Sequence, residues 1–337
     1  MEEPSTSTHN GDLRAESRSS RATTSGFVTT LAGISLSVRA ADPSPVDAFR
    51  ATFDPADAVD LGAQDTEPDT PEIVVVLEAE AREAPVEGEP VETYPDLRVW
   101  RDGDLLTLLH DRGVCAQVDD HRVRIGAGAD LVAAYRRLLP HALAHVLATH
   151  QRFVVHAAAV AAPGESALVL IGSSGAGKST LAYGALRAGW AVLGDDLVVL
   201  SRRGSDVVVD AFPKPLAIPG DALANADADP GADPADPRGR VTLPASVLAA
   251  GAHTVAGLVL LERGGGPEID HVSIPDLLSA VVGSFPGASE PERTRRFLPI
   301  AAQLARGPTA TLRASPDVRD SPAAAAATLT RLADALQ

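Results

Sequence analysis

Residues 172–179 read Gly172-Ser173-Ser174-Gly175-Ala176-Gly177-Lys178-Ser179, and this stretch decides the fold expected of the chain. It matches the pattern G-x-x-x-x-G-K-[ST], the Walker A motif, at every position. An apolar run, Ala167 to Ile171, comes before it, and a segment suited to a helix, Thr180 to Ala188, comes after it. A buried strand, a glycine-rich loop and a helix in this order form a P-loop unit. We therefore predict an α/β fold built around this loop.

The residue types of the motif indicate a site for a nucleoside triphosphate. Glycines allow positive φ angles, so successive backbone N–H groups can point at an anion, and the positive end of the following helix adds to this field. Lys178 is expected to place its ammonium on the β- and γ-phosphates, and the Ser179 hydroxyl to ligate Mg²⁺. We expect residues 172–180, which end at Thr180, to bind ATP and Mg²⁺.

Two adjacent acids follow the next predicted strand. Trp190 to Leu193 is expected to run parallel to the P-loop strand and near it, because βαβ crossovers are right-handed. It ends in Gly194-Asp195-Asp196, and ligands of α/β sheets bind at the carboxyl ends of strands. One carboxylate can hold Mg²⁺ while the other, for which we favour Asp195, accepts the proton of an attacking hydroxyl. The alternative is a pair of solvated aspartates in a turn.

A histidine is expected beside the phosphate-binding loop. Phe153 to Ala162 is predicted to be one strand that turns back through Gly164-Glu165 into the P-loop strand. In a two-residue hairpin the partners' numbers sum to 329, so His156 lies opposite Ser173, within a residue or two. In the alternative interpretation, His156 is a strand-end histidine whose ring bonds to backbone.

A polar segment, Pro219 to Arg240, is rich in Asp, Ala, Pro and Gly and is predicted to be a long loop, either a lid or a disordered insert. If the loop closes over the site, Arg240 at its end could reach a transferring phosphate. Ordinary surface arginines are an equally good interpretation of this segment's end.

Composition excludes several classes of function. The formal charge of −16 disfavours non-specific binding to nucleic acid or to an anionic membrane. Neither an apolar run of about 18 residues nor a basic-then-apolar signal pattern is present, so no membrane span or export is expected. The single cysteine, Cys115, fits a reducing compartment, and we expect a cytoplasmic protein.

The predicted organisation has three parts. Residues 1–25 are polar and expected to be a disordered tail. Residues 26–130 are predicted to form a small antiparallel β-rich region that recruits substrate, beginning with one strand from Phe27 to Val38. Residues 131–337 hold the P-loop domain, with 219–240 as a flexible acidic loop. His141 and His145 lie at i, i+4 on its first helix, but with no third ligand nearby in the sequence they are expected to be two histidines on a helix face.

Three segments together resemble a known family. His156-Ala-Ala-Ala-Val160, the Walker A stretch ending at Ser179, and Gly194-Asp195-Asp196 look like the core of HPr kinase/phosphorylase, and ATP-dependent phosphoenolpyruvate carboxykinases are similar in the same places. The layout is most similar to HPr-kinase-like proteins encoded beside peptide-modification genes. The resemblance implies a kinase domain with a mixed sheet, ATP and Mg²⁺ at Lys178 and Ser179, Asp195 and Asp196 as base and metal ligand, and His156 near the metal.

The sequence thus predicts a kinase that moves the γ-phosphoryl group of ATP to a Ser or Thr hydroxyl of a small protein or ribosomally made peptide. A small-molecule hydroxyl kinase and a P-loop ATPase or nucleotide-dependent switch remain as alternatives. The sequence leaves the oligomeric state open.

Overall fold

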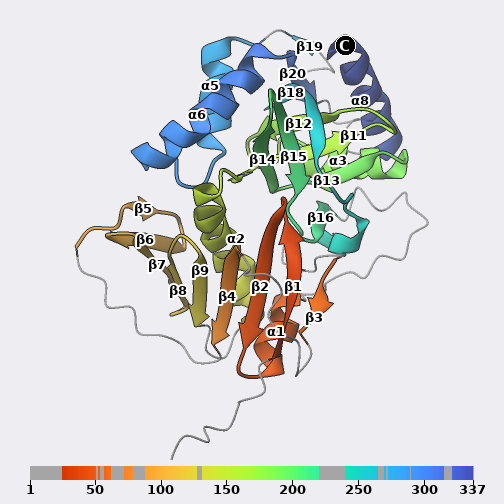
Figure 1. The fold of residues 1–337 in the computed structure, drawn as a ribbon. Coiled ribbons are helices and arrows are strands. Elements are labelled where there is room, and N and C mark those ends of the chain that lie inside the picture. The colour runs from red at the N-terminus through yellow and green to blue at the C-terminus, as the bar shows by residue number, and fades with distance from the viewer. Residues whose placement is uncertain are drawn as a thin grey trace, which may run out of the picture.

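A computed structural model describes the arrangement of the chain. It describes residues 25–50, 52–53, 57–61, 72–78, 88–126, 131–219, 240–264, 269–270, 272–288, 290–314 and 321–336. The tail expected at 1–25 and the loop expected at 219–240 lie outside these residues, except for their terminal positions. Two large β-sheets with helices packed on them make an α/β fold (Figure 1).

The first sheet contains nine strands and is larger than predicted. Its spatial order is β3-β1-β2-β4-β9-β8-β7-β6-β5. The bounds are β1 Ser25–Leu31, β2 Ile34–Ala40, β3 Val59–Asp60, β4 Ile73–Glu78, β5 Glu92–Thr93, β6 Leu97–Asp102, β7 Leu105–His110, β8 Cys115–Val118 and β9 Arg122–Gly126. The sheet is mixed, because β4 runs parallel to both β2 and β9, so the prediction of a small antiparallel sheet was wrong.

The predicted first strand, from Phe27 to Val38, is also two strands. Ala32 and Gly33 take positive φ angles of 51° and 78° and turn the chain into the β1–β2 hairpin. The alternation of apolar residues continues across this turn, which is why the periodicity alone missed it.

Two helices pack on the first sheet and close its core. They are α1, Pro43–Arg50, and α2, Leu131–Thr149, which contains Pro140 without a break. The molecule has two halves, one built on this first sheet and one on the second sheet described below. Phe212 belongs to the second half but joins the core of the first, where its ring meets that of Phe53 edge-on at a centroid distance of 5.2 Å. The two halves therefore share apolar contacts.

The second sheet carries the P-loop strand. Its order is β10-β14-β15-β18-β12-β11-β13, with β20 paired to β18 and β19 paired to β20. The bounds are β10 Phe153–Val155, β11 Ala158–Ala161, β12 Ala167–Gly172, β13 Ala191–Gly194, β14 Val198–Arg203, β15 Asp206–Ala211, β18 His253–Arg263, β19 Ile269–Asp270 and β20 Thr309–Ala314. Strands β12, β18 and β20 are parallel and their neighbours are antiparallel, so the sheet is mixed as predicted.

Helices cover both faces of this sheet (Figure 1). One layer is α5, Ile274–Gly283, with α6, Pro291–Arg306, whose Pro299 does not split it. The other is α3, Lys178–Arg187, with α8, Pro322–Leu336. Each layer contributes buried apolar side chains to its own core.

A two-stranded antiparallel sheet lies beside the second sheet. It is formed by β16, Leu216–Pro219, and β17, Arg240–Leu243, and the 3₁₀ turn η1, Ala245–Val247, follows it. Within the described residues, no helix is long and apolar enough to cross a membrane.

One prediction about the second sheet needs correction and another is confirmed. The strand expected from Phe153 to Ala162 is interrupted at His156, so β10 pairs with β14 and β11 pairs with β12 and β13. Strand β13 runs parallel to β12 as predicted, but β11 lies between them, because the hairpin that leads into β12 occupies that edge.

Candidate functional site

The Walker A stretch forms the turn between β12 and α3. Gly175 and Gly177 take φ angles of 78° and 106°, which L-residues with a side chain rarely adopt. Lys178 is the first residue of α3, and its ammonium donates hydrogen bonds to the carbonyl oxygens of Gly172 at 2.6 Å and Ser173 at 3.4 Å. Burial lowers the pKa of Lys178, while the carboxylates of Asp196 and Asp195 raise it. The loop is therefore turned as a phosphate cradle requires, with its lysine folded against its own carbonyls.

Asp195 lies directly after β13 and is buried against the start of α3. Its carboxylate forms a side-chain hydrogen bond with Ser179 and accepts another from the backbone N–H of Ala217 on β16, at 3.3 Å. Burial raises the pKa of Asp195, the ammonium of Lys214 lowers it, the neighbouring Asp196 raises it, and the net direction is upward. The structure thus brings Asp195, from the predicted acidic pair, into contact with Ser179, the last residue of the Walker A stretch.

Asp196 has the opposite electrostatic character. Its Oδ1 lies 2.9 Å from Nδ1 of His156, and its Oδ2 accepts a hydrogen bond from the Lys214 ammonium. Burial raises its pKa, but the hydrogen bond from His156 and the charge of Lys214 outweigh this effect and hold the pKa well below its usual range. The two adjacent aspartates therefore differ in proton affinity because Asp196 contacts the ring of His156 and the ammonium of Lys214, whereas Asp195 is more deeply buried and contacts only neutral donors.

His156 reaches this position by a break in its strand. The pairs Ala158↔Leu170 and Ala161↔Ala167 show that partners' numbers sum to 328 instead of 329, and the pairing stops before His156. The histidine N–H instead donates to the carbonyl of Ser284 at 2.7 Å. His156 is therefore not opposite Ser173 in a ladder; its ring lies on Asp196.

Two cationic residues of the site were not foreseen. Lys214, between Pro213 and Pro215, contacts Asp196, and Arg263 at the end of β18 donates to the carbonyl of Ser174 in the loop. The sequence does contain a signal for Lys214, namely the rarity of lysine. Of the 29 Lys and Arg residues in the chain, two are lysines, and the other one is Lys178 of the Walker A stretch. No local pattern marks Arg263.

The structure leaves the role of Arg240 untested. Its backbone begins β17 opposite Pro219, in the two-stranded sheet whose other strand carries Ala217. Its side chain lies outside the described part of the molecule, so its reach toward a phosphate stays a prediction.

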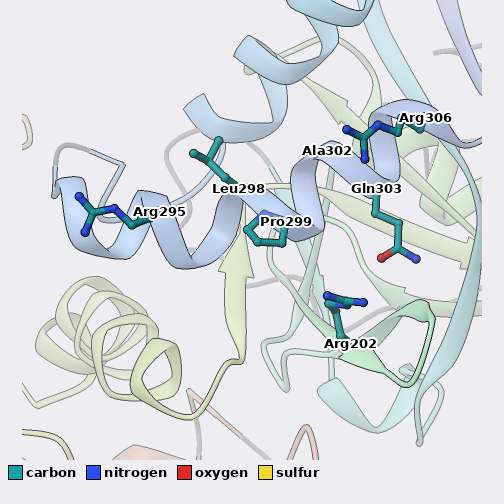
Figure 2. Close-up of a pocket in the computed structure, with 7 residues that line it drawn as sticks. All are labelled: Arg202, Arg295, Leu298, Pro299, Ala302, Gln303 and Arg306. Atoms are coloured by element: carbon teal, nitrogen blue, oxygen red, sulfur yellow. The ribbon is translucent and has the colours of Figure 1, made fainter.

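A cavity of about 620 Å³ lies elsewhere, between α6 and β14 (Figure 2). Arg202, Arg295 and Arg306 surround it, with Leu298, Pro299, Ala302 and Gln303. None of its lining residues belongs to the P-loop or to the aspartate pair, so this cavity is separate from the candidate site around Lys178 and Asp195.

Comparisons with known proteins find likeness among solved structures and none among family models or curated proteins. No family model matches the chain, and no curated protein matches it. Among solved structures, the HPr(Ser) kinase/phosphatase from Coxiella burnetii is similar with 10% sequence identity and a TM-score of 0.29, covering 54% of this chain and 97% of that one. At this TM-score the functional proposal has to rest on the local geometry of the site.

Proposed function

We propose that this protein is an ATP-dependent kinase that transfers the γ-phosphoryl group to a Ser or Thr hydroxyl of a small protein or peptide. The observation that carries the proposal is the unequal pair Asp195 and Asp196 beside Ser179 of the P-loop. Adjacent carboxylates whose pKa values are pushed apart are suited to different roles, one as a proton acceptor and one as a permanently charged group.

Asp195 is assigned as the base. Its raised pKa gives its carboxylate a greater proton affinity than an ordinary aspartate has, and a general base works best when its pKa approaches the working pH. It would accept the proton of the acceptor hydroxyl as the oxygen–phosphorus bond forms and the bond between the γ-phosphorus and the β–γ bridging oxygen breaks.

Asp196 and Ser179 are assigned to Mg²⁺. Carboxylate and hydroxyl oxygens are the hard ligands that this ion prefers, and the low pKa of Asp196 keeps it ionised. Bound Mg²⁺ would neutralise charge on the phosphates. His156 orients the Asp196 carboxylate, and Lys214 occupies its other oxygen.

Lys178 is assigned to the phosphates themselves. Its ammonium would leave the carbonyls of Gly172 and Ser173 and bind phosphate oxygens, while the loop's backbone N–H groups supply the remaining donors. Phosphoryl transfer depends on positioning and charge neutralisation. Lys178, Ser179 and the two aspartates supply the types of group that these two tasks require.

The test is transfer from γ-labelled ATP by wild type, Asp195→Asn and the control Asp206→Asn, which changes an exposed aspartate at the start of β15. The acceptor pool is a host lysate, and the labelled product is identified by mass spectrometry. We expect Asp195→Asn to bind ATP with unchanged affinity and to lose transfer, and Asp206→Asn to keep both. Undiminished transfer by Asp195→Asn removes the base assignment.

The same assay separates the other two functions. Labelling of small alcohols in the absence of any polypeptide identifies a small-molecule kinase. Release of phosphate without any labelled acceptor identifies an ATPase or a switch. Either result would overturn the protein-kinase proposal.

A further inference from the structure

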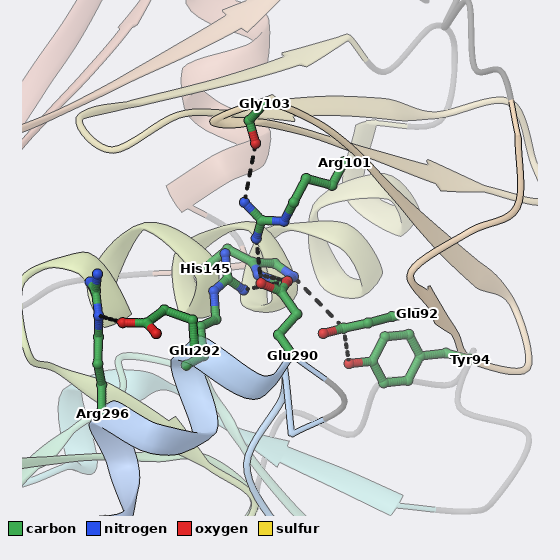
Figure 3. A network of polar contacts seen from close by, with 9 residues as sticks. Glu92, Tyr94, Arg101, Gly103, His145, Glu290, Glu292 and Arg296 are labelled. Atoms are coloured by element: carbon green, nitrogen blue, oxygen red, sulfur yellow. Dashed lines mark hydrogen bonds and ion pairs between the residues drawn. The ribbon is translucent and has the colours of Figure 1, made fainter.

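A second polar cluster lies far from the P-loop in the sequence and joins the two halves of the molecule (Figure 3). It consists of Glu92 on β5, His145 on α2 and Glu290, which immediately precedes α6. These residues are 4%, 1% and 8% exposed. The fold brings to His145 two carboxylates that the sequence does not place near it, so a possible ligand set exists that the sequence could not indicate.

The cluster contains several buried polar atoms without a hydrogen-bond partner among the described residues. They are both ring nitrogens of His145, Oε1 of Glu92 and Oε1 of Glu290. Buried polar atoms are nearly always hydrogen-bonded, so two imidazole nitrogens and two carboxylate oxygens without a partner call for a bound group. Nη1 of the neighbouring Arg293 is also buried and without a hydrogen-bond partner among the described residues. One ligand atom from each residue can be chosen so that all three lie within 4.8 Å of one another.

The distances within the cluster fit a group held between the side chains better than direct contact. His145 Nε2 is 3.9 Å from Glu92 Oε2, and Nδ1 is 3.8 Å from Glu290 Oε1. A protonated imidazole bonded directly to a carboxylate would need about 2.7–3.2 Å. Two ligands on one tetrahedral Zn²⁺ lie roughly 3.4 Å apart, given metal–ligand distances of about 2.0–2.2 Å. One ion takes only one nitrogen of the ring, so the carboxylate that faces the other nitrogen has to turn toward it, and the cluster has to contract from its present limit of 4.8 Å.

The surroundings hold both carboxylates in place. The Tyr94 hydroxyl donates to Glu92 Oε2 at 2.7 Å, and Arg101 donates to Glu290 Oε2. Arg293 Nη1 lies 3.3 Å from Glu290 Oε1. Metal-binding carboxylates are commonly fixed by such outer contacts. Oε1 of Glu92 has no such partner among the described residues, whereas an ion would share Oε1 of Glu290 with Arg293.

We propose that Glu92, His145 and Glu290 bind one divalent cation of the Zn²⁺ class. One imidazole nitrogen and two carboxylate oxygens are ligands that Zn²⁺ takes readily, whereas Mg²⁺ prefers oxygen ligands alone. The ion would tie the edge strand β5 of the first sheet to the start of α6 in the second half. Its role is therefore structural, and it is independent of the kinase proposal.

The test uses the full chain after removal of metal with a strong chelator. Zn²⁺ is titrated into it calorimetrically, and Co²⁺ is titrated with its visible d–d absorption as a report of nitrogen and oxygen ligation. We expect one equivalent of Zn²⁺ per chain and a rise in Tm of several degrees. His145→Gln and Glu92→Gln should abolish both effects.

Three controls locate the ion. His141→Gln removes the half-buried histidine one turn earlier on α2, and His150→Gln removes one of two neighbouring histidine rings, His121 and His150, near the surface. Asp196→Asn removes the acid assigned to Mg²⁺. All three should keep the Zn²⁺ equivalent and the Tm rise.

Other results would overturn the site. The proposal fails if wild type binds less than a tenth of an equivalent of Zn²⁺, or if Glu92→Gln binds as wild type does. Should His145→Gln not fold, the Co²⁺ spectrum of wild type decides, because a spectrum of hexa-aqua type excludes the cluster. None of these readouts depends on kinase activity.

Discussion

Nδ1 of His156 lies 2.9 Å from Oδ1 of Asp196, and the strand that should have carried the histidine past this point is broken to allow it. The ring bonds the carboxylate while the histidine's backbone N–H bonds Ser284, so the imidazole is fixed from both sides. This contact ties the segment between β10 and β11 to the residue pair after β13. It is the relationship on which the assigned role of His156 depends.

Replacing His156 by Gln should weaken transfer without preventing nucleotide binding. Residues that orient a metal-binding carboxylate typically cost about 10- to 100-fold in activity or metal affinity when they are removed. We expect the apparent KM for Mg²⁺ to rise by such a factor, measured in transfer assays over a Mg²⁺ series. His253→Gln, at the start of β18, is the matched control, and an unchanged Mg²⁺ dependence in His156→Gln would refute the assignment.

Lys214 should not be replaceable by arginine. It is one of two lysines in a chain that otherwise uses arginine, and its ammonium contacts Asp196 from a segment held between two prolines. A planar guanidinium is larger and presents its donors as a fork, so it cannot occupy the same position. We expect Lys214→Arg and Lys214→Met to reduce kcat to similar degrees, while Arg202→Lys leaves it unchanged. Wild-type kcat in Lys214→Arg would show that only the positive charge matters.

Phe212 should couple the stability of the two halves. Its ring is buried and meets Phe53 edge-on, which places a residue of the second half in the core of the first. Truncation to Ala should cost about 3–5 kcal/mol of unfolding free energy. Urea denaturation of Phe53→Ala, Phe212→Ala and the double variant should give a coupling energy of about 0.5–1.5 kcal/mol beyond area burial. Strict additivity of the two single variants would argue against this contact.

His141 should make the protein less stable in mild acid. The pKa of His141 is lowered from 6.5 to about 4, chiefly by burial; the charge of Asp96 opposes this shift and the charge of Lys214 adds to it. Between these two values the unfolded chain binds a proton that the folded chain excludes, so the free energy of unfolding falls as pH falls from 6.5 toward 4. The slope from this group is at most about 1.4 kcal/mol per pH unit.

The measurement for His141 is the difference between two curves. The unfolding free energy of His141→Gln and of wild type is followed from pH 7 downward, so that the carboxylates shared by both proteins cancel. We expect the variant to lose less stability over this window. His121→Gln, at an exposed position, should follow the wild-type curve, and parallel curves for all three proteins would show that His141 is not the group responsible.

Local sequence predicted the parts of the candidate site that are formed by consecutive residues. The strand, loop and helix around Lys178 are present, and Asp195 and Asp196 follow a short strand as expected. Glycine positions and apolar runs constrain the backbone within a few residues, which is why they were readable. The hairpin register was displaced because the turn spans five residues, Ala162–Ser166, instead of two.

Other features were beyond the reach of local patterns. The pairing of β4 with β2 and β9 joins strands that are separated by long connections, and parallel pairing leaves no turn signature in the sequence. The contacts of Arg263 with Ser174, and of His145 with Glu92 and Glu290, join residues from distant elements. A residue's type shows what it can bond to, but not which distant segment will supply the partner.

The sequence by itself determined that the chain contains a strand, a glycine-rich loop and a helix in succession, with two acids at a nearby strand end, because spacing along the backbone fixes these features. Only the tertiary structure decided that His156 and Lys214 both contact Asp196, that Asp195 is buried against Ser179, and that His145 lies between two glutamates. The reason is physical: proton affinity and ligand geometry depend on burial and on neighbours within a few ångströms, and those neighbours are chosen by how the sheets and helices pack.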